Sequence, residues 1–205
     1  IESGNEDPNT RVIVIKATGP AFSAGHDLRE TRRRGDEDYT AWHARIDTLL
    51  QDCAAMMTSI LRAPKPIIAC VQGIASAAGC QLVSACDLAI ASEDATFCTP
   101  GVNIGTFCTT PLVGIGRNLS RKHALEMALT GDQFDAATAE RFGLINRSVP
   151  ASELEQATQE LAGKIASRSA ESIARGKSAF YQQVEMPLDK AFELANEVMR
   201  DNLTA

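Results

Sequence analysis

Apolar residues in the first half of the chain follow two different spacings. Residues 11–16 and 66–72 are continuous β-branched runs, typical of strands buried on both faces of a parallel sheet. Residues 88–91 are a third candidate strand. Between the first two runs, residues 38–62 carry apolar side chains at helical spacing and stop just before Pro64. This order of strand, helix and strand predicts a right-handed crossover between parallel neighbours.

Later segments are helical in pattern. Helices are expected over residues 77–86, 114–119, 121–130, 133–143, 152–166, 169–184 and 188–203. In the fourth of these segments, Asp135 is suited to cap the start of the helix and Gly143 to end it. We therefore predict a strand-rich first half and a second half that contains helices alone.

The size and charge of the chain limit the number of domains and the kinds of partner that we expect. With 205 residues, 44% of them hydrophobic, the chain can bury one sizeable core, so one main domain is expected. Its formal net charge of −6 argues against a nucleic-acid partner, which would need a broad basic surface. No apolar stretch approaches the ~20 residues that cross a bilayer, so we expect no membrane span. Carboxylates and histidines do not cluster at metal-ligand spacing, so we expect no metal site.

The six cysteines indicate a reducing environment. They lie mostly inside apolar runs and lack CxxC spacing. Free cysteine is among the most buried residue types, so these residues are expected to be buried thiols rather than disulfides. We expect a cytoplasmic protein, with the mitochondrial matrix as the alternative for a eukaryotic source. No signal peptide is visible, but the abrupt start at Ile1 leaves targeting undecided.

Two turns made of small residues carry the strongest chemical signal. Residues 22–28 (FSAGHDL) follow the first expected strand, and residues 73–88 (GIASAAGCQLVSACDL) follow the second. Each turn then enters a segment that reads as helix. Two turns of this kind can direct two backbone N–H groups at one point, where they would stabilise the charge that develops on a carbonyl oxygen.

Three motifs in order carry a resemblance to a known family. The first turn fits F-x-x-G-x-D-L, the second fits G-x-x-x-x-x-G-C-x-L-x-x-x-C-D, and Thr130-Gly-Asp is followed by Ala136, Ala139 and Gly143-Leu144. Together they resemble the crotonase superfamily, also called the enoyl-CoA hydratase/isomerase family, over about residues 11–203.

The resemblance implies an architecture and a ligand. The fold would be α/β, with a spiral of ββα units over residues 1–150 that carries the CoA and oxyanion site, and a helical C-terminal region over 151–205. The ligand would be an acyl-CoA thioester, so that coenzyme A arrives as part of the substrate and no cofactor is covalently bound. The family usually assembles as a homotrimer or a dimer of trimers. Family members also have further segments before and after the part that this chain matches.

The resemblance places an oxyanion hole at the backbone N–H groups of His26 and Ala78, without a role for either side chain. The turn beside the CoA ligand consists of Ala24, Gly25, His26, Asp27, Leu28 and Arg29. Asp27 is expected to cap this turn. Arg29 stands where family members often place a basic residue near the nucleotide phosphates. The arginines at 32–34 either add to that basic patch or form a solvated face.

Two positions depart from the hydratase pattern. Family members that hydrate enoyl-CoA place two glutamates around the substrate, and here those positions hold Gln81 and Gly101. Glutamine can form hydrogen bonds but cannot take a proton at neutral pH. Positioned acid–base groups supply ~10² to 10⁴ in rate, and an oxyanion donor ~10² to 10³. We therefore expect a site that polarises a thioester carbonyl but adds water poorly. Cys108 is a candidate reactive group, with a structural thiol as the alternative.

Three classes of function stay open from the sequence. The first is a lyase or isomerase reaction of fatty acid metabolism, through an enolate-like anion of a CoA thioester. The second is acyl-CoA binding without efficient turnover. The third is a Clp-like serine peptidase with Ser76 as the nucleophile, which would need a histidine base oriented by an acid. No histidine lies between Ser76 and His123, where that base would be expected, so the third class is remote.

Overall fold

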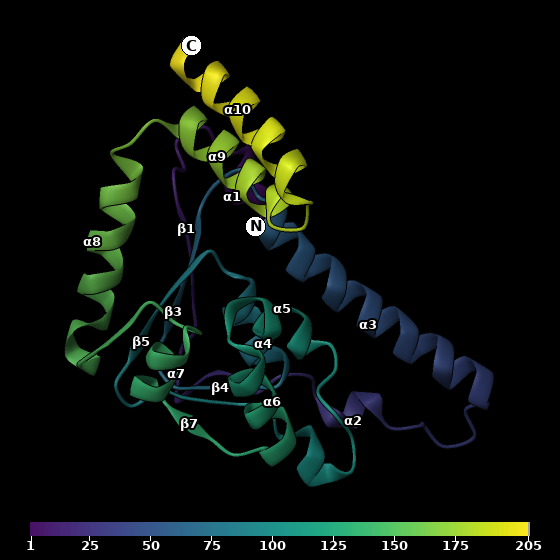
Figure 1. Ribbon diagram of the computed structural model, residues 1–205. Helices are drawn as coiled ribbons and strands as arrows, with labels where there is room; N and C mark the ends of the chain where they lie inside the picture. Colours follow the sequence, from purple (N-terminus) through teal and green to yellow (C-terminus); the bar gives the residue numbers. More distant parts are fainter. Residues whose placement is uncertain (205) are drawn as a thin grey trace.

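The computed structural model describes residues 1–204 and contains two four-stranded sheets (Figure 1). The first has the order β1 (Ile13–Lys16), β3 (Ile67–Val71), β5 (Leu88–Ser92) and β8 (Arg147–Val149). The second has the order β2 (Ala21–Ser23), β4 (Ile74–Ser76), β6 (Thr96–Cys98) and β7 (Phe134–Asp135). Ala205, the last residue of the predicted C-terminal region 151–205, lies outside the described residues.

Successive turns of the chain place one strand in each sheet. β1 continues into β2, β3 into β4 and β5 into β6, and equivalent strands of successive turns pair in parallel. Only β6 and β7 pair antiparallel within the described sheets. This arrangement confirms the expected α/β fold and its spiral of ββα units.

The core lies around β3, the second strand of the first sheet. All five of its residues are buried, because β1 and β5 flank it, α8 packs on one face and the main hydrophobic cluster lies on the other. This explains why its apolar run does not alternate with polar residues. Phe97, Ile60 and Ile67 are among the largest side chains that are completely buried in this core.

The long helix α3 (Tyr39–Arg62) begins and ends where the sequence predicts. The Asp38 side chain accepts a hydrogen bond from the Thr40 N–H at 3.1 Å, and the helix stops at Ala63, before Pro64. The fully buried side chains of α3 all lie in its C-terminal half, at Cys53, Met57 and Ile60. The N-terminal half extends away from the body of the molecule (Figure 1). Polar residues in that half therefore have no sheet to face.

The prediction that the second half contains helices alone is wrong. β7 and β8 interrupt it, and they have two and three residues. β8 pairs in parallel with β5, and the Asn146 side chain beside it accepts a hydrogen bond from the Ala89 N–H at 2.8 Å. Strands this short do not show a period of two in the sequence, so tertiary pairing alone reveals them.

The remaining elements are mainly helical. The short ones are α1 (Glu2–Glu6), α2 (Leu28–Thr31) and the 3₁₀ turns η1 (Pro100–Ile104) and η2 (Ala151–Glu153). The others are α4 (Ala78–Ala85), α5 (Pro111–Asn118), α6 (Arg121–Thr130), α7 (Ala136–Phe142), α8 (Leu154–Ala166), α9 (Ala170–Gln183) and α10 (Leu188–Thr204). As predicted, Asp135 caps α7 through a 2.8 Å bond from the Thr138 N–H, and Gly143 ends the helix with a φ of +90°.

A buried ion pair attaches the C-terminal helices to the core. Lys177 of α9 donates to Asp87 at 2.7 Å and also to the carbonyl oxygens of Ile60 and Lys65, both at 3.1 Å. The other carboxylate oxygen of Asp87 accepts from the Tyr181 hydroxyl at 2.9 Å. Burial and the neighbouring Asp87 carboxylate raise the pKa of Tyr181. α9 and α10 then run side by side at one end of the molecule (Figure 1).

Candidate functional site

The two small-residue turns lie against each other. β2 and β4 pair in parallel, with Ser23 opposite Ala75, so the turn that follows β2 lies beside the turn that follows β4. Gly25 has a φ of +88°, and a Cβ at this position would lie 3.2 Å from the Ala78 nitrogen and 3.0 Å from the Ser76 oxygen. Glycine is favoured at this position because the backbone conformation and the close approach both disfavour a side chain.

A second glycine allows the same close approach from the other side. A Cβ at Gly79 would overlap the carbonyl oxygen of Ser23 and would lie 2.7 Å from the Ser23 Cβ. The first turn of α4 can therefore pack directly on the end of β2. The glycines that the sequence singled out at these turns thus have a physical reason in the structure.

Ala77 forms the sharp corner between β4 and α4. Its φ of +51° and ψ of −114° make it the only residue other than glycine with a positive φ among residues 1–204. Such a conformation costs roughly 1–3 kcal/mol and persists only where the surroundings hold it. Here the Ala77 N–H donates to the Cys98 oxygen at 2.9 Å and its carbonyl accepts from the Gln81 N–H at 3.0 Å. The corner directs the Ala78 N–H out of the start of α4.

The two backbone donors that the sequence singled out are unpaired in the described part of the chain. Neither the His26 N–H nor the Ala78 N–H has a hydrogen-bond acceptor within the part of the chain that the structure describes. The Ala78 N–H also lies at a helix N-terminus, where the helix dipole favours negative charge. The structure therefore brings both residues to one place, each with an unused backbone donor.

The rest of the first turn is polar and open. Ala24, Asp27, Leu28 and Arg29 are exposed. Asp27 caps α2 by accepting from the Arg29 N–H at 2.9 Å, which confirms the predicted cap. The Arg29 guanidinium bonds to the same carboxylate at 2.7 Å, and these bonds lower the pKa of Asp27. The His26 ring is half-buried, and its Nε2 lacks a partner among the described residues.

Gln81 lies on α4, three residues after Ala78. Its side chain is 6% exposed, and its Oε1 lies 4.0 Å from the thiol of Cys53 on α3, which donates to it. The side chain is therefore enclosed between α3 and α4. Its end group is an amide, which offers hydrogen bonds but no proton transfer at neutral pH.

Gly101 and Cys108 are in contact across the loop that follows β6. Gly101 is buried in η1, and a Cβ there would lie 3.0 Å from both the Cys108 nitrogen and the Cys108 sulfur. A longer side chain at residue 101 would have to displace this part of the loop. Cys108 thus fills the space beside Gly101, the position at which the resemblance led us to expect a glutamate in hydratases of the family.

All six cysteines are free thiols, as predicted, and five of them are buried. Burial raises the pKa of Cys86 to about 12, and burial also raises the pKa values of Cys53, Cys80 and Cys98. Cys108 is only half-buried. The Cys98 thiol donates to the Ser76 hydroxyl at 3.4 Å, whereas no imidazole is bonded to Ser76 within residues 1–204. The arrangement that a serine peptidase needs is therefore not present in the described part of the chain.

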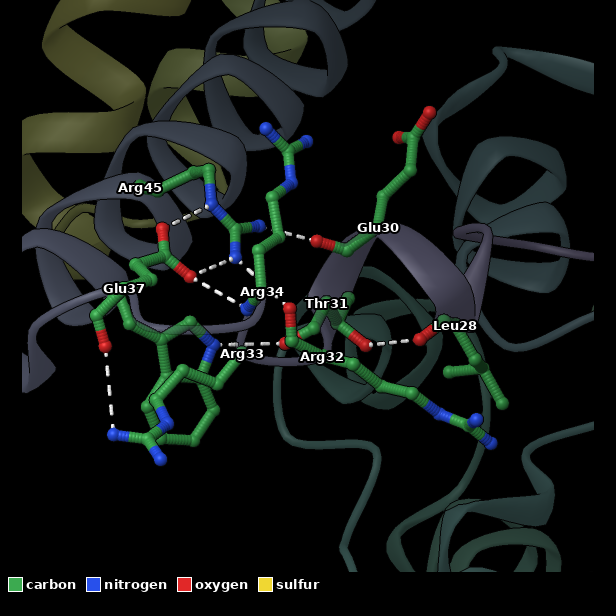
Figure 2. A network of polar contacts seen from close by, with 9 residues as sticks. Leu28, Glu30, Thr31, Arg32, Arg33, Arg34, Glu37 and Arg45 are labelled. Carbon is green, nitrogen blue, oxygen red and sulfur yellow. Dashed lines mark hydrogen bonds and ion pairs between the residues drawn. The ribbon is translucent and has the colours of Figure 1, made fainter.

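The sequence reasoning missed one polar network beside the first turn (Figure 2). Arg45 of α3 binds the Glu37 carboxylate with two parallel bonds of 2.9 and 2.8 Å. The same guanidinium donates to the carbonyl oxygens of Glu30 and of Arg32, the latter at 2.9 Å. The two bonds from Arg45 to the carboxylate, with one from the Arg34 N–H at 3.0 Å, lower the pKa of Glu37 to about 2. We call this cluster, Glu37 and Arg45 with the carbonyls they hold, the Arg45 network.

No group of three or more histidine, cysteine, aspartate or glutamate side chains within residues 1–204 is placed to hold a metal ion. None of the helices in that part of the chain is both long and apolar enough to cross a bilayer.

Comparison with known proteins identifies the family. The family model described as enoyl-CoA hydratase/isomerase matches residues 1–204. The chain therefore belongs to the enoyl-CoA hydratase/isomerase family, in agreement with the fold and with the two facing turns.

Among curated relatives, the chain is 47% identical over 199 residues to the mitochondrial enoyl-CoA hydratase domain-containing protein 3 of Rattus norvegicus. That match covers 97% of this chain and 64% of the rat protein. Among solved structures, the human enoyl coenzyme A hydratase domain-containing protein 3 is 43% identical, with a TM-score of 0.90, covering 98% of this chain and 77% of that one. An enoyl-CoA hydratase/isomerase family protein from Silicibacter pomeroyi is 41% identical with the same TM-score, covering 100% and 84% of the two chains.

Proposed function

We propose that this chain binds an acyl-CoA thioester with the thioester carbonyl oxygen between the backbone N–H groups of His26 and Ala78. The observation that carries the proposal is the pair of unused donors on two turns in contact at Gly25. Coenzyme A would arrive as part of the substrate, along the turn formed by residues 24–29. Family membership supports this class of ligand.

The proposed chemistry is stabilisation of a thioester enolate. Two backbone donors held in place by packed turns stabilise the oxygen charge that grows as the enolate forms, without reorganising. The Ala78 donor gains further from its place at the start of α4. The proton that leaves or joins the neighbouring carbon needs a separate acid–base group.

Efficient hydration is not part of the proposal. Gln81 replaces one expected carboxylate by an amide, and Gly101 offers no side chain and no space for one beside Cys108. If the chain is catalytic, the acid–base group comes from Cys108, from residues outside this chain or from a neighbouring subunit. Binding of acyl-CoA without efficient turnover is the second candidate, and the same two replacements favour it.

Assembly and location are also proposals. Apolar side chains on the two last helices, Phe180, Leu188, Phe192, Met199 and Leu203, are between 56% and 78% exposed. A groove of about 400 Å³ lies between α9 and α10. These surfaces support association with another chain, and the family resemblance is the ground for proposing a homotrimer or dimer of trimers. The name of the rat relative supports a mitochondrial location over the cytoplasmic location that the cysteines suggested.

Two measurements on the full-length protein test the proposal. Calorimetry measures acetyl-CoA binding, and loss of enoyl absorbance follows the hydration of crotonyl-CoA. We expect binding, and hydration far below the ~1 to 10³ s⁻¹ of ordinary enzymes. Hydration in that range would refute the argument from Gln81 and Gly101. Absence of binding would refute the proposed function as a whole.

The donors themselves are tested by infrared spectroscopy of the bound ligand. Acetyl-CoA labelled with ¹³C at the thioester carbonyl should absorb at lower frequency when bound, because hydrogen bonds polarise the C=O bond. Gly25→Val should abolish the shift, since its side chain would enter the space beside the Ala78 nitrogen. Gly163→Val, on α8 with open space around residue 163, is the control. A bound carbonyl without a shift would refute the oxyanion hole.

A further inference from the structure

The short helix α2 is not held in place by packing. It has four residues, and none of them is buried. A helix of one turn is unstable in water by itself, because its end groups have no partners within the helix. At its start the Asp27 side chain accepts a hydrogen bond from the Arg29 N–H. The carbonyl groups at its other end need partners from elsewhere in the chain.

Those partners come from α3. The Arg45 guanidinium donates to the carbonyl oxygens of Glu30 and Arg32, the latter at 2.9 Å (Figure 2). The Trp42 indole donates to the Thr31 carbonyl oxygen at 2.9 Å. Three consecutive carbonyl groups at the C-terminal end of α2 thus accept bonds from two side chains of α3. A positive charge at this end also suits the helix dipole. Arg45 and Trp42 therefore form a C-terminal cap that a different helix supplies.

Glu37 fixes the direction of the Arg45 guanidinium. Its carboxylate accepts two parallel bonds, at 2.9 and 2.8 Å, and the other N–H groups are then directed at the carbonyls. The side chains of Arg45 and Glu37 are only 24% and 15% exposed, so solvent screens this pair less than an open one. Lysine has a point charge in place of the planar fork of arginine. Arginine therefore suits a position that bonds one carboxylate and two carbonyls together.

The first small-residue turn continues directly into α2. His26 lies one residue before Asp27, which is the N-cap of α2. On the other side of His26, Gly25 lies close to the Ala78 nitrogen. The His26 peptide group is therefore held between two fixed points, the close approach at Gly25 and the start of α2. If α2 unwound, only the first of these would remain.

We infer that Arg45 and Trp42 are positioning residues, which cap α2 from α3 and thereby keep the His26 N–H directed at the ligand carbonyl. The inference rests on the proposed function and deepens it, because it names the side chains that hold one of the two donors. Backbone donors stabilise a developing charge best when they need no reorganisation, so the order of α2 matters for His26. The Ala78 donor belongs to α4 and does not depend on this cap. The two donors should therefore respond differently when the cap is removed.

Limited proteolysis of the full-length protein tests the cap. Residues 32–34 are three exposed arginines, so trypsin can cut there once the segment opens. Arg45→Met should speed cleavage at these sites about tenfold or more, because bonds from a charged donor are lost and cleavage follows the open population. Mass spectrometry of the first fragments identifies the sites.

Arg175→Met is the matched control for this change. Arg175 also binds a carboxylate, that of Glu171, and a backbone carbonyl, that of Asp201, but it lies on α9. Its replacement should leave cleavage at residues 32–34 unchanged.

The ¹³C-labelled carbonyl of bound acetyl-CoA tests the link to His26. At saturating ligand, Arg45→Met should reduce the infrared shift by about half, since one of two donors is misplaced and the other is kept. Trp42→Phe removes one bond of the cap and keeps an aromatic ring, so it should cause a smaller loss of the same kind. Arg45→Lys keeps the charge without the fork and should be intermediate. Arg175→Met should keep the full shift.

Each outcome decides a different point. Faster cleavage together with a partial loss of the shift supports the inference. Unchanged cleavage in Arg45→Met, or faster cleavage with the full shift, overturns it while the proposed function stands. Loss of ligand binding in Arg45→Met also overturns it, because the whole site would then depend on Arg45. If the unmodified protein shows no shift, the oxyanion hole fails and the inference fails with it. If Arg45→Met does not fold, Trp42→Phe decides by the same two measurements.

Discussion

Replacing Lys177 by methionine should destabilise the protein strongly, because it leaves a buried carboxylate without its counter-ion. The side chains of Lys177 and Asp87 are only 8% and 14% exposed. Breaking one partner of a buried pair typically costs about 3–5 kcal/mol. Asp87 would keep its bonds from the Ile67 N–H and the Tyr181 hydroxyl, at 2.7 and 2.9 Å. We therefore expect the lower end, about 3 kcal/mol of unfolding free energy.

Urea denaturation followed by circular dichroism measures this free energy. In thermal melts the same loss corresponds to a decrease of about 6–12 °C in Tm for a chain of this size. Lys190→Met is the matched control, because the Lys190–Glu193 pair is also joined at 2.7 Å but its side chains are 59% and 64% exposed. That control should lose no more than about 0.5 kcal/mol.

A double mutant separates the loss of the pair from the loss of packing. Lys177→Met combined with Asp87→Asn leaves no unpaired charge, so its destabilisation should be smaller than the sum of the two single changes. A loss below about 1 kcal/mol for Lys177→Met, or simple additivity in the double mutant, would refute the reasoning. Either result would mean that water reaches Asp87 in the folded protein.

Three further changes have expected outcomes. The pKa of Glu37 is lowered from 4.5 to about 2, so its contribution to stability is complete above about pH 4.5 and lost as the pH falls to about 2. Glu37→Gln should flatten the dependence of Tm on pH in that window, and an unchanged slope would contradict the network. Gly25→Ala should destabilise the fold by about 1–2 kcal/mol in urea, because φ is +88° and Ser76 is close, whereas Gly163→Ala, inside α8 with open space around it, should stabilise by about 0.5–1 kcal/mol. A maleimide should label the native protein at Cys108 first, since the other cysteines are buried, and mass spectrometry that finds another site labelled as fast would contradict this.

The sequence was most informative where an element spans several periods or ends in a specific cap. Residues 38–62 contain enough turns for the helical spacing to stand out, and Asp135 and Gly143 bound α7 through side-chain and backbone chemistry that is local. β7 and β8 could not be found in this way. They are short, and what makes them strands is the pairing with β6 and β5 from distant parts of the chain.

The site residues show the same contrast between local sequence signals and tertiary contacts. Gly25 and Gly79 could be recognised because a turn without side chains is itself a local sequence signal. Arg45 could not, because its partners include backbone carbonyls, which every residue has, and its distance from them depends on how α3 folds back. The contact between Gly101 and Cys108 likewise follows from loop packing, although both positions were singled out beforehand.

The donors that we propose at His26 and Ala78 belong to the peptide backbone, and this decides how the site must be probed. Alanine scanning truncates side chains one at a time, and it would leave both N–H groups in place; residue 78 is already alanine. Such a scan would report the centre of the site as inert and its surroundings as important. Replacing the Ala78 amide by an ester through chemical synthesis removes the N–H donor and preserves the path of the chain. A change in the backbone, and not in a side chain, is therefore needed to test these donors.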